Sequence, residues 1–173
     1  RGQVVSYDYD DLGRPLSRRA GARDGRLLAA WTYDTVRFGK GRQATATSYD
    51  ADGNAYTSAV LSYTASYRPR RMSMTIPEVN GIGKLSGVYE SSIGYNPDGS
   101  VAGESYPKAG GLFQEEVRYG YDDLGQPLTT HGGPVGSTVW YASRTDYTKY
   151  GELHRVHLGS GTKRAWLTQL YDD

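Results

Sequence analysis

The sequence contains no cysteine, and several residue types that usually build a core are scarce. The absence of cysteine excludes disulfides, zinc ribbons and cysteine nucleophiles. It fits a reducing cytosol and an exported protein equally well, so it does not indicate a compartment. Only two phenylalanines and two methionines occur, and apolar residues make up 37% of the chain. That share is small for a globular domain, so a thick dry core is not expected.

The sequence also lacks an excess of charge of one sign and any long apolar run. Its 20 basic and 19 acidic residues are mixed along the chain and give a net charge of +1. We therefore expect no nucleic-acid partner and no attraction to an anionic membrane. No apolar run approaches the roughly 18 residues of a membrane span, and no signal peptide is found within these residues. Glycine and β-branched residues interrupt every candidate helical window, so no helix is predicted.

The chain begins at Arg1 and ends with Leu170-Tyr171-Asp172-Asp173. This ending resembles the first half of the stretch YDYDDLGRPL at Tyr7–Leu16. We therefore expect the 173 residues to be a window of a longer polypeptide.

Glycine and tyrosine are abundant, with 23 and 16 copies. A tyrosine side chain combines an apolar ring with a polar end, which suits the half-exposed face of a sheet. Much of this tyrosine and glycine belongs to a repeated phrase. The stretch YDYDDLGRPL at Tyr7–Leu16 returns as YGYDDLGQPL at Tyr119–Leu128.

Further copies of the phrase are weaker, and their spacing varies from roughly 14 to 32 residues. The strong copies at Gly99, Gly125 and Gly151 lie 26 residues apart. A recurring period of this size predicts an array of supersecondary units. The candidate motif residues are Tyr7, Tyr9, Asp10, Gly13, Tyr33, Asp34, Tyr49, Asp50, Gly53, Tyr95, Gly99, Tyr119, Tyr121, Asp122, Gly125, Tyr147 and Gly151, with a further relative at Tyr63–Pro69.

Each unit has the pattern of a β-hairpin. Apolar and polar residues alternate along 114–121, which is the signal of a half-buried strand. The following Asp122–Gly125 offers a carboxylate for backbone N–H groups and a glycine for a positive φ. Because 26 is even, we expect Tyr95, Tyr121 and Tyr147 to lie at equivalent places on one face of the sheet.

Proline follows several turns closely, at Pro15, Pro69 and Pro127. Since proline lacks an N–H, we expect strand pairing to skip these residues or to bulge around them. The predicted fold class is all-β, with about a dozen antiparallel strands. One hairpin alone is marginal in water, so each hairpin must share its faces and edges with the next.

The pattern Tyr-x-Tyr-Asp-x-x-Gly-Arg at Tyr7–Arg14 resembles the YD repeat of the Rhs family, and the resemblance covers essentially the whole chain. Rhs proteins, insecticidal toxin-complex components and teneurins wind YD hairpins into a spiral sheet that closes as a hollow shell. In bacterial members that shell encloses a C-terminal toxin. The chain departs from the family pattern at Pro15, where leucine is usual, at Gln126 and Glu152 in place of arginine, and at Asn96 and Thr148 in place of aspartate.

The resemblance implies that residues 1–173 form one segment of a shell wall, with roughly six to seven hairpin units. It implies a structural role without catalysis, and secretion or association with the cell surface. The implied partners are neighbouring repeats of the same longer chain and an enclosed toxin.

Candidate chemical sites have simpler structural explanations. The three histidines are His131, His154 and His157. The last two could suggest a metal site, but residues three apart in a strand point to opposite faces, so a solvated strand is expected there. Asp50–Asn54 resembles the start of a calcium loop without its distal glutamate, so a turn is favoured. Asp8, Asp10 and Asp11 could form a catalytic acid pair, but turns also favour aspartate. No cofactor and no metal are expected.

Two glycine-rich stretches, Gly39–Gly41 and Gly159–Lys163, lack phosphate-loop spacing and predict turns. The basic clusters Arg14–Arg23 and Arg68–Arg71 are expected on a solvated surface. An alternative function is a carbohydrate- or cell-surface-binding module that uses exposed aromatic rings. Rings that line one groove would favour that function, and rings buried between strands would not. The tryptophans concerned are Trp31, Trp140 and Trp166.

Overall fold

The computed structural model describes residues 2–79, 85–134 and 136–171. In these residues the regular secondary structure is entirely β, and no helix is long and apolar enough to cross a membrane. The predicted fold class, an all-β array of antiparallel hairpins, is confirmed. Arg1, Asp172 and Asp173, on which the expectation of a longer polypeptide partly rests, lie outside the described residues.

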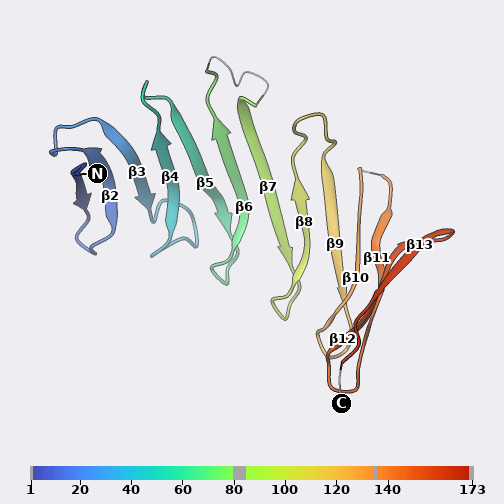
Figure 1. Ribbon diagram of the computed structural model, residues 1–173. Helices are drawn as coiled ribbons and strands as arrows, with labels where there is room; N and C mark the ends of the chain where they lie inside the picture. The colour runs from blue at the N-terminus through green and yellow to red at the C-terminus, as the bar shows by residue number, and fades with distance from the viewer. Residues whose placement is uncertain (1, 80–84, 135, 172–173) are drawn as a thin grey trace. The chain divides into compact units, whose positions relative to one another are not determined.

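Thirteen strands are found in the described part of the chain, and each is hydrogen-bonded to the next in chain order (Figure 1). The outermost strands, β1 and β13, have one neighbour each. The strands are β1 (Val5–Tyr9), β2 (Pro15–Ala20), β3 (Leu27–Tyr33), β4 (Gln43–Tyr49), β5 (Ala55–Tyr63), β6 (Pro69–Ile76), β7 (Gly87–Tyr95), β8 (Val101–Tyr106), β9 (Glu115–Tyr121), β10 (Pro127–Gly132), β11 (Val139–Tyr147), β12 (Leu153–Ser160) and β13 (Lys163–Thr168).

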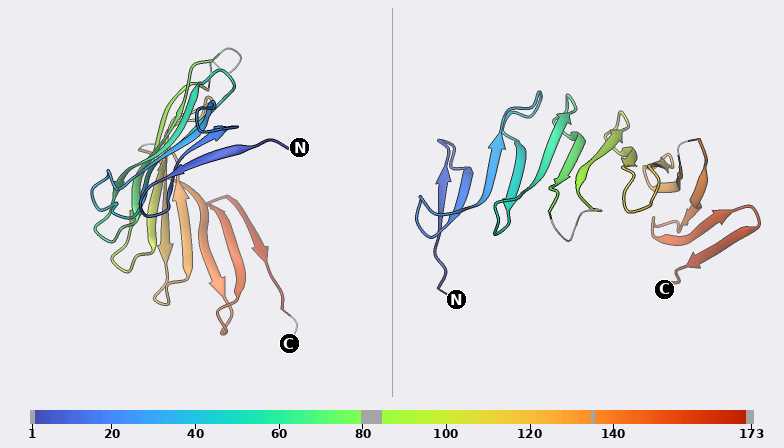
Figure 2. Two further views of the ribbon diagram at one scale, coloured as in Figure 1. Left: turned by 90° about the vertical axis from the view of Figure 1, so that its left-hand side faces the viewer. Right: turned by 90° about the horizontal axis from the view of Figure 1, so that it is seen from above.

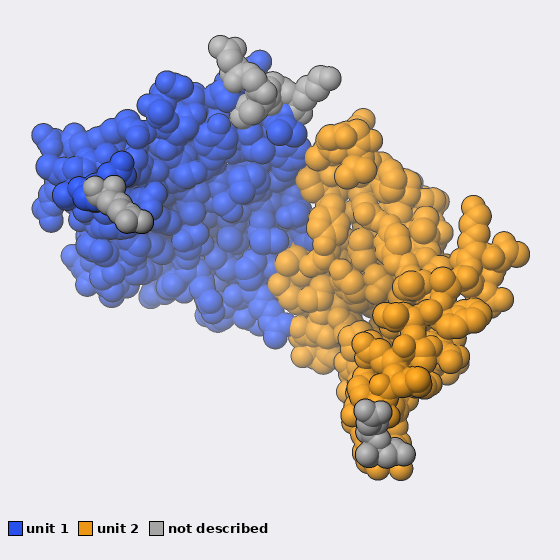
Figure 3. Space-filling model, viewed as in Figure 1, with its two compact units in different colours: residues 1–92 blue, residues 93–173 orange. Residues whose placement is uncertain are grey.

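The chain divides into two compact units, Arg1–Ser92 and Ile93–Asp173 (Figure 3). The first contains β1 to β6 and most of β7, and the second contains the end of β7 and β8 to β13. Within the first unit the strands follow one another side by side in a single layer (Figure 2). The assignment of residues 1–173 to one array of six to seven hairpin units stays a prediction.

Proline begins three of the even-numbered strands, at Pro15, Pro69 and Pro127. The pairing of each of these strands with the preceding strand is irregular beside the proline, with register shifts at Asp8/Tyr9, Ser62/Tyr63 and Pro127/Thr129. The predicted bulges are therefore confirmed. Proline suits these places because its nitrogen cannot donate to the neighbouring strand. The same shift also occurs at Thr32/Tyr33 and Asp146/Tyr147, where Gln43 and Leu153 begin the strand, so proline is not required for it.

The strand registers of the second unit fix which side chains share a face. Tyr119 pairs with Thr130, which pairs with Ala142, which pairs with Leu158. Directly paired residues share a face, and every second residue of a strand returns to it. Val156 lies two residues from Leu158 on β12 and pairs with Thr145, and Tyr147 lies two residues beyond Thr145 on β11. Tyr147 is therefore on the same face as Tyr119 and Tyr121, as predicted. The position of Tyr95 on that face stays a prediction.

Very little of the described chain is deeply buried. The buried residues there are Ala29, Ala44, Tyr63, Ser73 and the glycines Gly39, Gly132 and Gly133, and many large apolar side chains are exposed. A single layer of strands has no second layer to cover it, so stability must come from strand pairing and from contacts between neighbouring hairpins.

Candidate functional site: the turns and ties between successive hairpins

Six five-residue turns of the described chain share one backbone geometry. In the first, the Asp10 N–H donates to the Arg14 carbonyl and the Gly13 N–H donates to the Asp10 carbonyl, both at 3.0 Å. The fourth position requires a positive φ, which glycine adopts without a steric cost. Tyr67 holds that position with a φ of 62° in one copy. The turns are residues 10–14, 50–54, 64–68, 96–100, 122–126 and 148–152.

The first side chain of the turn binds the backbone of the turn itself. Asp10 Oδ1 accepts hydrogen bonds from the N–H groups of Leu12 and Arg14, at 3.0 and 2.9 Å. Asp122 makes the equivalent pair of bonds. In one of the copies without aspartate, the Thr148 hydroxyl accepts from the Glu152 N–H at 3.2 Å. A hydroxyl can therefore replace the carboxylate in this role.

The turn at 50–54 has the same backbone bonds but lies at the other end of the strands. It follows β4, whereas the other five turns follow odd-numbered strands. Tyr49 pairs directly with Ala55 without a bulge, and no proline follows this turn. The candidate motif at Tyr49–Gly53 is thus a different kind of connection from the one at Tyr7–Gly13. This turn contributes to the irregular spacing in the first half of the chain, together with the longer connection between β3 and β4.

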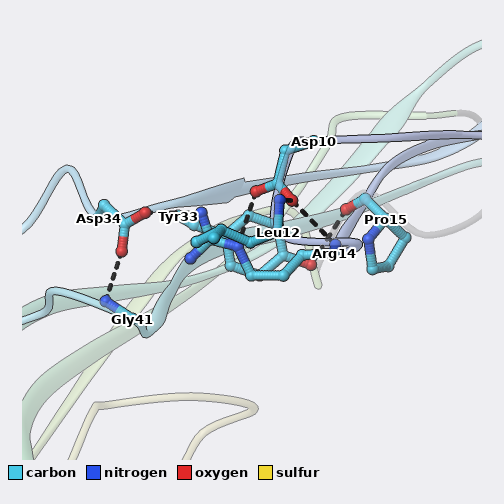
Figure 4. Close-up of polar contacts among 7 residues, drawn as sticks. All are labelled: Asp10, Leu12, Arg14, Pro15, Tyr33, Asp34 and Gly41. Carbon is cyan, nitrogen blue, oxygen red and sulfur yellow. Dashed lines mark hydrogen bonds and ion pairs between the residues drawn. The ribbon is translucent and has the colours of Figure 1, made fainter.

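Arg14 joins the first turn to the next connection at the same end of the strands (Figure 4). Its Nε donates to Asp10 Oδ2 at 2.7 Å, its Nη2 donates to Asp34 Oδ2 at 2.6 Å, and its guanidinium carbon lies 4.3 Å from the centre of the Tyr33 ring. Asp34 Oδ1 also accepts from the Gly41 N–H at 2.5 Å. One arginine therefore contacts two carboxylates and one aromatic ring.

These contacts shift the pKa values of the groups. The backbone hydrogen bond from Arg14 lowers the pKa of Asp10 below its ordinary value of 3.8. The side-chain hydrogen bond from Arg14 does the same for the pKa of Asp34. The two hydrogen bonds, first to Asp34 and then to Asp10, raise the pKa of Arg14. All three groups are therefore held in their charged forms.

Tyrosine hydroxyls connect a hairpin back to the preceding one at five places in the described chain, in a contact that we call the tyrosine tie. The tyrosine at or just after the end of an odd-numbered strand donates to the carbonyl of the first residue of the preceding even-numbered strand. The donor and acceptor pairs are Tyr33–Pro15 (3.0 Å), Tyr63–Gln43 (2.8 Å), Tyr121–Val101 (2.9 Å), Tyr147–Pro127 (2.6 Å) and Tyr171–Leu153 (2.9 Å).

A forward contact also recurs. Gln126, which stands where the first copy has Arg14, donates through Nε2 to the Gly151 carbonyl at 3.2 Å. Arginine and glutamine at this position thus both reach the next connection at the same end of the strands. Sequence reasoning missed the ties and the forward contacts, because they join residues that become neighbours only after the strands pair.

The candidate catalytic and metal-binding residues do not converge. Asp8 accepts from the Ser17 hydroxyl at 2.7 Å, while Asp10 serves the turn. His157 contacts Asp146 at 2.7 Å. His131 packs against Trp140, with ring centres 4.7 Å apart. In the described residues, no group of three or more histidine and acidic side chains is placed to hold a metal ion.

The remaining stretches singled out in the sequence fold as connections. Gly39 and Gly41 lie between β3 and β4, and the paired residues Ser160 and Lys163 close the hairpin of β12 and β13. The predicted turns at these places are confirmed. Asp50 Oδ1 accepts from the N–H groups of Asp52 and Asn54, so this carboxylate also serves a turn.

The fold and this pattern of contacts define a repeat protein made of antiparallel hairpins. No family model matches the sequence, and no curated protein matches it. Solved structures match its fold. Crystal structures of TcdB2-TccC3-Cdc42 and TcdB2-TccC3 superimpose with TM-scores of 0.68 and 0.64 over 91% and 90% of this chain, at 14% and 12% sequence identity. The Tc holotoxin pore of Photorhabdus luminescens, with a TccC3 mutation, matches with a TM-score of 0.63 over 90% of the chain, at 15% identity.

The chain spans 8% of the length of each of these three matched chains. It therefore has the fold of a short segment of them. The expected resemblance to toxin-complex components is confirmed for the fold.

Proposed function

We propose that this chain is a segment of the wall of a YD-repeat shell. Its function is mechanical: a continuous antiparallel sheet separates a compartment from its surroundings. The observation that carries the proposal is the regular connection between hairpins, forward through Arg14 or Gln126 and back through the tyrosine ties. These contacts serve a repeated sheet and do not converge on one pocket.

The exposure of the sheet supports the same function. A single-layer sheet that leaves Tyr9, Leu124 and Trp166 exposed is poorly covered as an isolated domain. A wall has partners that supply the cover: neighbouring repeats at its edges and a cargo on one face. In this proposal the cargo is a C-terminal toxin, the segment has no catalytic role, and the whole polypeptide is secreted or attached to the cell surface.

The test uses the longer polypeptide that contains this chain. Limited proteolysis of the purified polypeptide is expected to leave its C-terminal region uncut while the shell is intact. A matched variant carries a specific protease site in the 122–126 turn, so that the wall can be opened deliberately. After that cut, digestion of the C-terminal region should accelerate. Equal digestion before and after opening would contradict enclosure.

A further inference from the structure

A group of tyrosines and glutamates lies on one face of β8, β9 and β11, and the ties and forward contacts between hairpins do not use it. Glu104 pairs with Val117, and Tyr106 pairs with Glu115, so these four residues share a face. Tyr119 lies two residues beyond Val117 on β9 and returns to that face. We call this group the acidic tyrosine face, and it is defined by Glu104, Tyr106, Glu115, Val117, Tyr119 and Tyr141.

Tyr141 reaches this face through an irregularity in β11. The pairing of β10 with β11 shifts between Thr130 and His131, which leaves Tyr141 as the extra residue of a β-bulge. The Tyr141 hydroxyl donates to Glu115 Oε1, two strands away. On the way its ring passes Gly132, where a Cβ atom would lie 3.0 Å from Tyr141 Cε2 and 3.1 Å from Glu115 Oε1. A glycine at this position therefore leaves the room that the contact needs.

The tyrosine hydroxyls hold the two carboxylates in place. Glu104 Oε2 accepts hydrogen bonds from Tyr106 and from Tyr119, the latter at 3.0 Å. The bond to Glu104 raises the pKa of Tyr106 to about 12, and the bond to Glu115 raises the pKa of Tyr141. Near pH 7 the phenols are therefore neutral donors, and the carboxylates carry the charge. The second oxygens, Glu104 Oε1 and Glu115 Oε2, accept no hydrogen bond from the described residues.

Both carboxylates lack a cation. Glu104 and Glu115 are half-buried, and neither makes an ion pair within the described part of the chain. The arginines of β8 to β11 are Arg118 and Arg144, which lie on the opposite face and contact acidic side chains there, at 3.0 and 2.5 Å. A carboxylate that is partly removed from water without a cation is unfavourable. A positively charged ligand would therefore stabilise this face.

We propose that the acidic tyrosine face binds an aliphatic diamine, a short methylene chain with an ammonium group at each end. Glu104 and Glu115 are diagonal neighbours on adjacent strands, about 7 Å apart, which suits the two ends of an extended four-carbon chain. One ammonium group donates to Glu104 Oε1 and the other to Glu115 Oε2. The rings of Tyr106 and Tyr141, 44% and 41% exposed, attract the ammonium groups, and the methylene chain lies on Val117.

Two other cationic ligands fit this face less well. A single metal ion needs several ligands that converge on it, and the described residues contain no group of three or more acidic and histidine side chains placed to hold one. A lysine-rich peptide also carries ammonium groups, but its backbone N–H and C=O groups would lie over Val117 and the tyrosine rings without partners. A diamine has only methylene groups between its charges.

The inference is tested by calorimetric titration of the chain with putrescine. Butylamine is the probe with a single ammonium group, and magnesium chloride and trilysine represent a metal ion and a peptide. We expect putrescine to bind about tenfold more tightly than butylamine, and less tightly as salt is raised. Glu104→Gln and Glu115→Gln should each weaken putrescine binding about tenfold, because a charged hydrogen bond is lost while the phenols keep an acceptor. Tyr106→Ala removes one ring and should weaken it about threefold.

Glu116→Gln is the matched control, because Glu116 follows Glu115 directly, is exposed and faces the opposite side of the sheet. This variant should bind putrescine like the unmodified chain. Absence of putrescine binding, an equal loss in the Glu116 variant, equal binding of butylamine, or tighter binding of magnesium or trilysine would each overturn the proposal. Any of these results leaves enclosure untouched, because the proteolysis experiment measures that separately.

Discussion

Tyr63 is the most buried of the tyrosines that form ties, with 8% of its surface exposed. Its hydroxyl donates to the Gln43 carbonyl at 2.8 Å, and burial raises the pKa of this hydroxyl. Tyr63→Phe removes the donor and leaves a carbonyl without that partner. We expect a loss of about 1 kcal/mol in the free energy of unfolding, measured by urea denaturation.

The control for Tyr63 is Tyr67→Phe. Tyr67 is 50% exposed, and its hydroxyl has no partner in the described chain. Its removal should change the unfolding free energy by less than about 0.5 kcal/mol. Equal effects of the two substitutions would show that the tie does not contribute to stability.

The lowered pKa of Asp10 makes stability depend on pH. Near the ordinary value of 3.8 the unfolded chain binds this proton more readily than the folded chain. The stabilisation is therefore fully present above 3.8 and is lost as the pH falls through the lower folded pKa. Asp34, Asp50 and Asp146 also have lowered pKa values and act in the same direction.

We expect the thermal midpoint to fall steeply below about pH 4, the ordinary range of an aspartate. Asp10→Asn should make that fall less steep, since it removes one of the carboxylates. Asp11→Asn is the control, because the Asp11 side chain makes no hydrogen bond in the described residues. A pH profile of the thermal midpoint that is unchanged by Asp10→Asn would contradict the link between Asp10 protonation and stability.

At the scale of the element, the close approach of β8 and β9 depends on a glycine. A Cβ atom on Gly103 would lie 2.6 Å from the Val117 carbonyl oxygen, a backbone atom that cannot move aside alone. Gly103→Ala must therefore push the two strands apart, and we expect a loss of about 1–3 kcal/mol in unfolding free energy. Gly94→Ala is the control, because its nearest atom would be 3.8 Å away.

Chemical denaturation of both variants checks this prediction. Gly94→Ala should be neutral or slightly stabilising, since it reduces the freedom of the unfolded chain. A Gly103 variant as stable as the Gly94 variant would show that the strands adjust without cost.

The turns could be predicted from the sequence because their contacts are local. The Asp122 carboxylate binds N–H groups two and four residues ahead, so residue order alone brings the partners together. The bulges beside Pro15 and Pro127 could also be predicted, because proline lacks the N–H that regular pairing uses.

What the sequence did not predict depends on strand pairing. The tie from Tyr147 to Pro127 and the contact from Gln126 to Gly151 join residues 20 and 25 apart, and they form only when the hairpins are in register. The end of the strands at which the 50–54 turn lies depends on whether an odd or an even number of strands precedes it. A local motif does not contain that information.

At the scale of the whole molecule, the open edges of the sheet govern how the chain behaves in solution. β1 and β13 each have one strand neighbour, and both carry exposed apolar residues, such as Val5 and Leu167. Unpaired N–H and C=O groups at such edges favour pairing with another chain. We therefore expect the isolated chain to associate, with an average mass above 19.0 kDa that rises with concentration in light scattering.

The edge contribution is tested by placing a charge on each outer strand with Val5→Lys and Leu167→Lys, because lysine on an edge opposes strand addition. The doubly substituted chain should move toward the monomer mass. Leu124→Lys is the matched control, since Leu124 is 85% exposed but lies in a turn away from the edges. If Leu124→Lys dissociates the assembly equally, association occurs through exposed apolar side chains in general. If the unmodified chain is monomeric at every concentration, its edges do not pair, and the wall needs a covalent neighbour to extend.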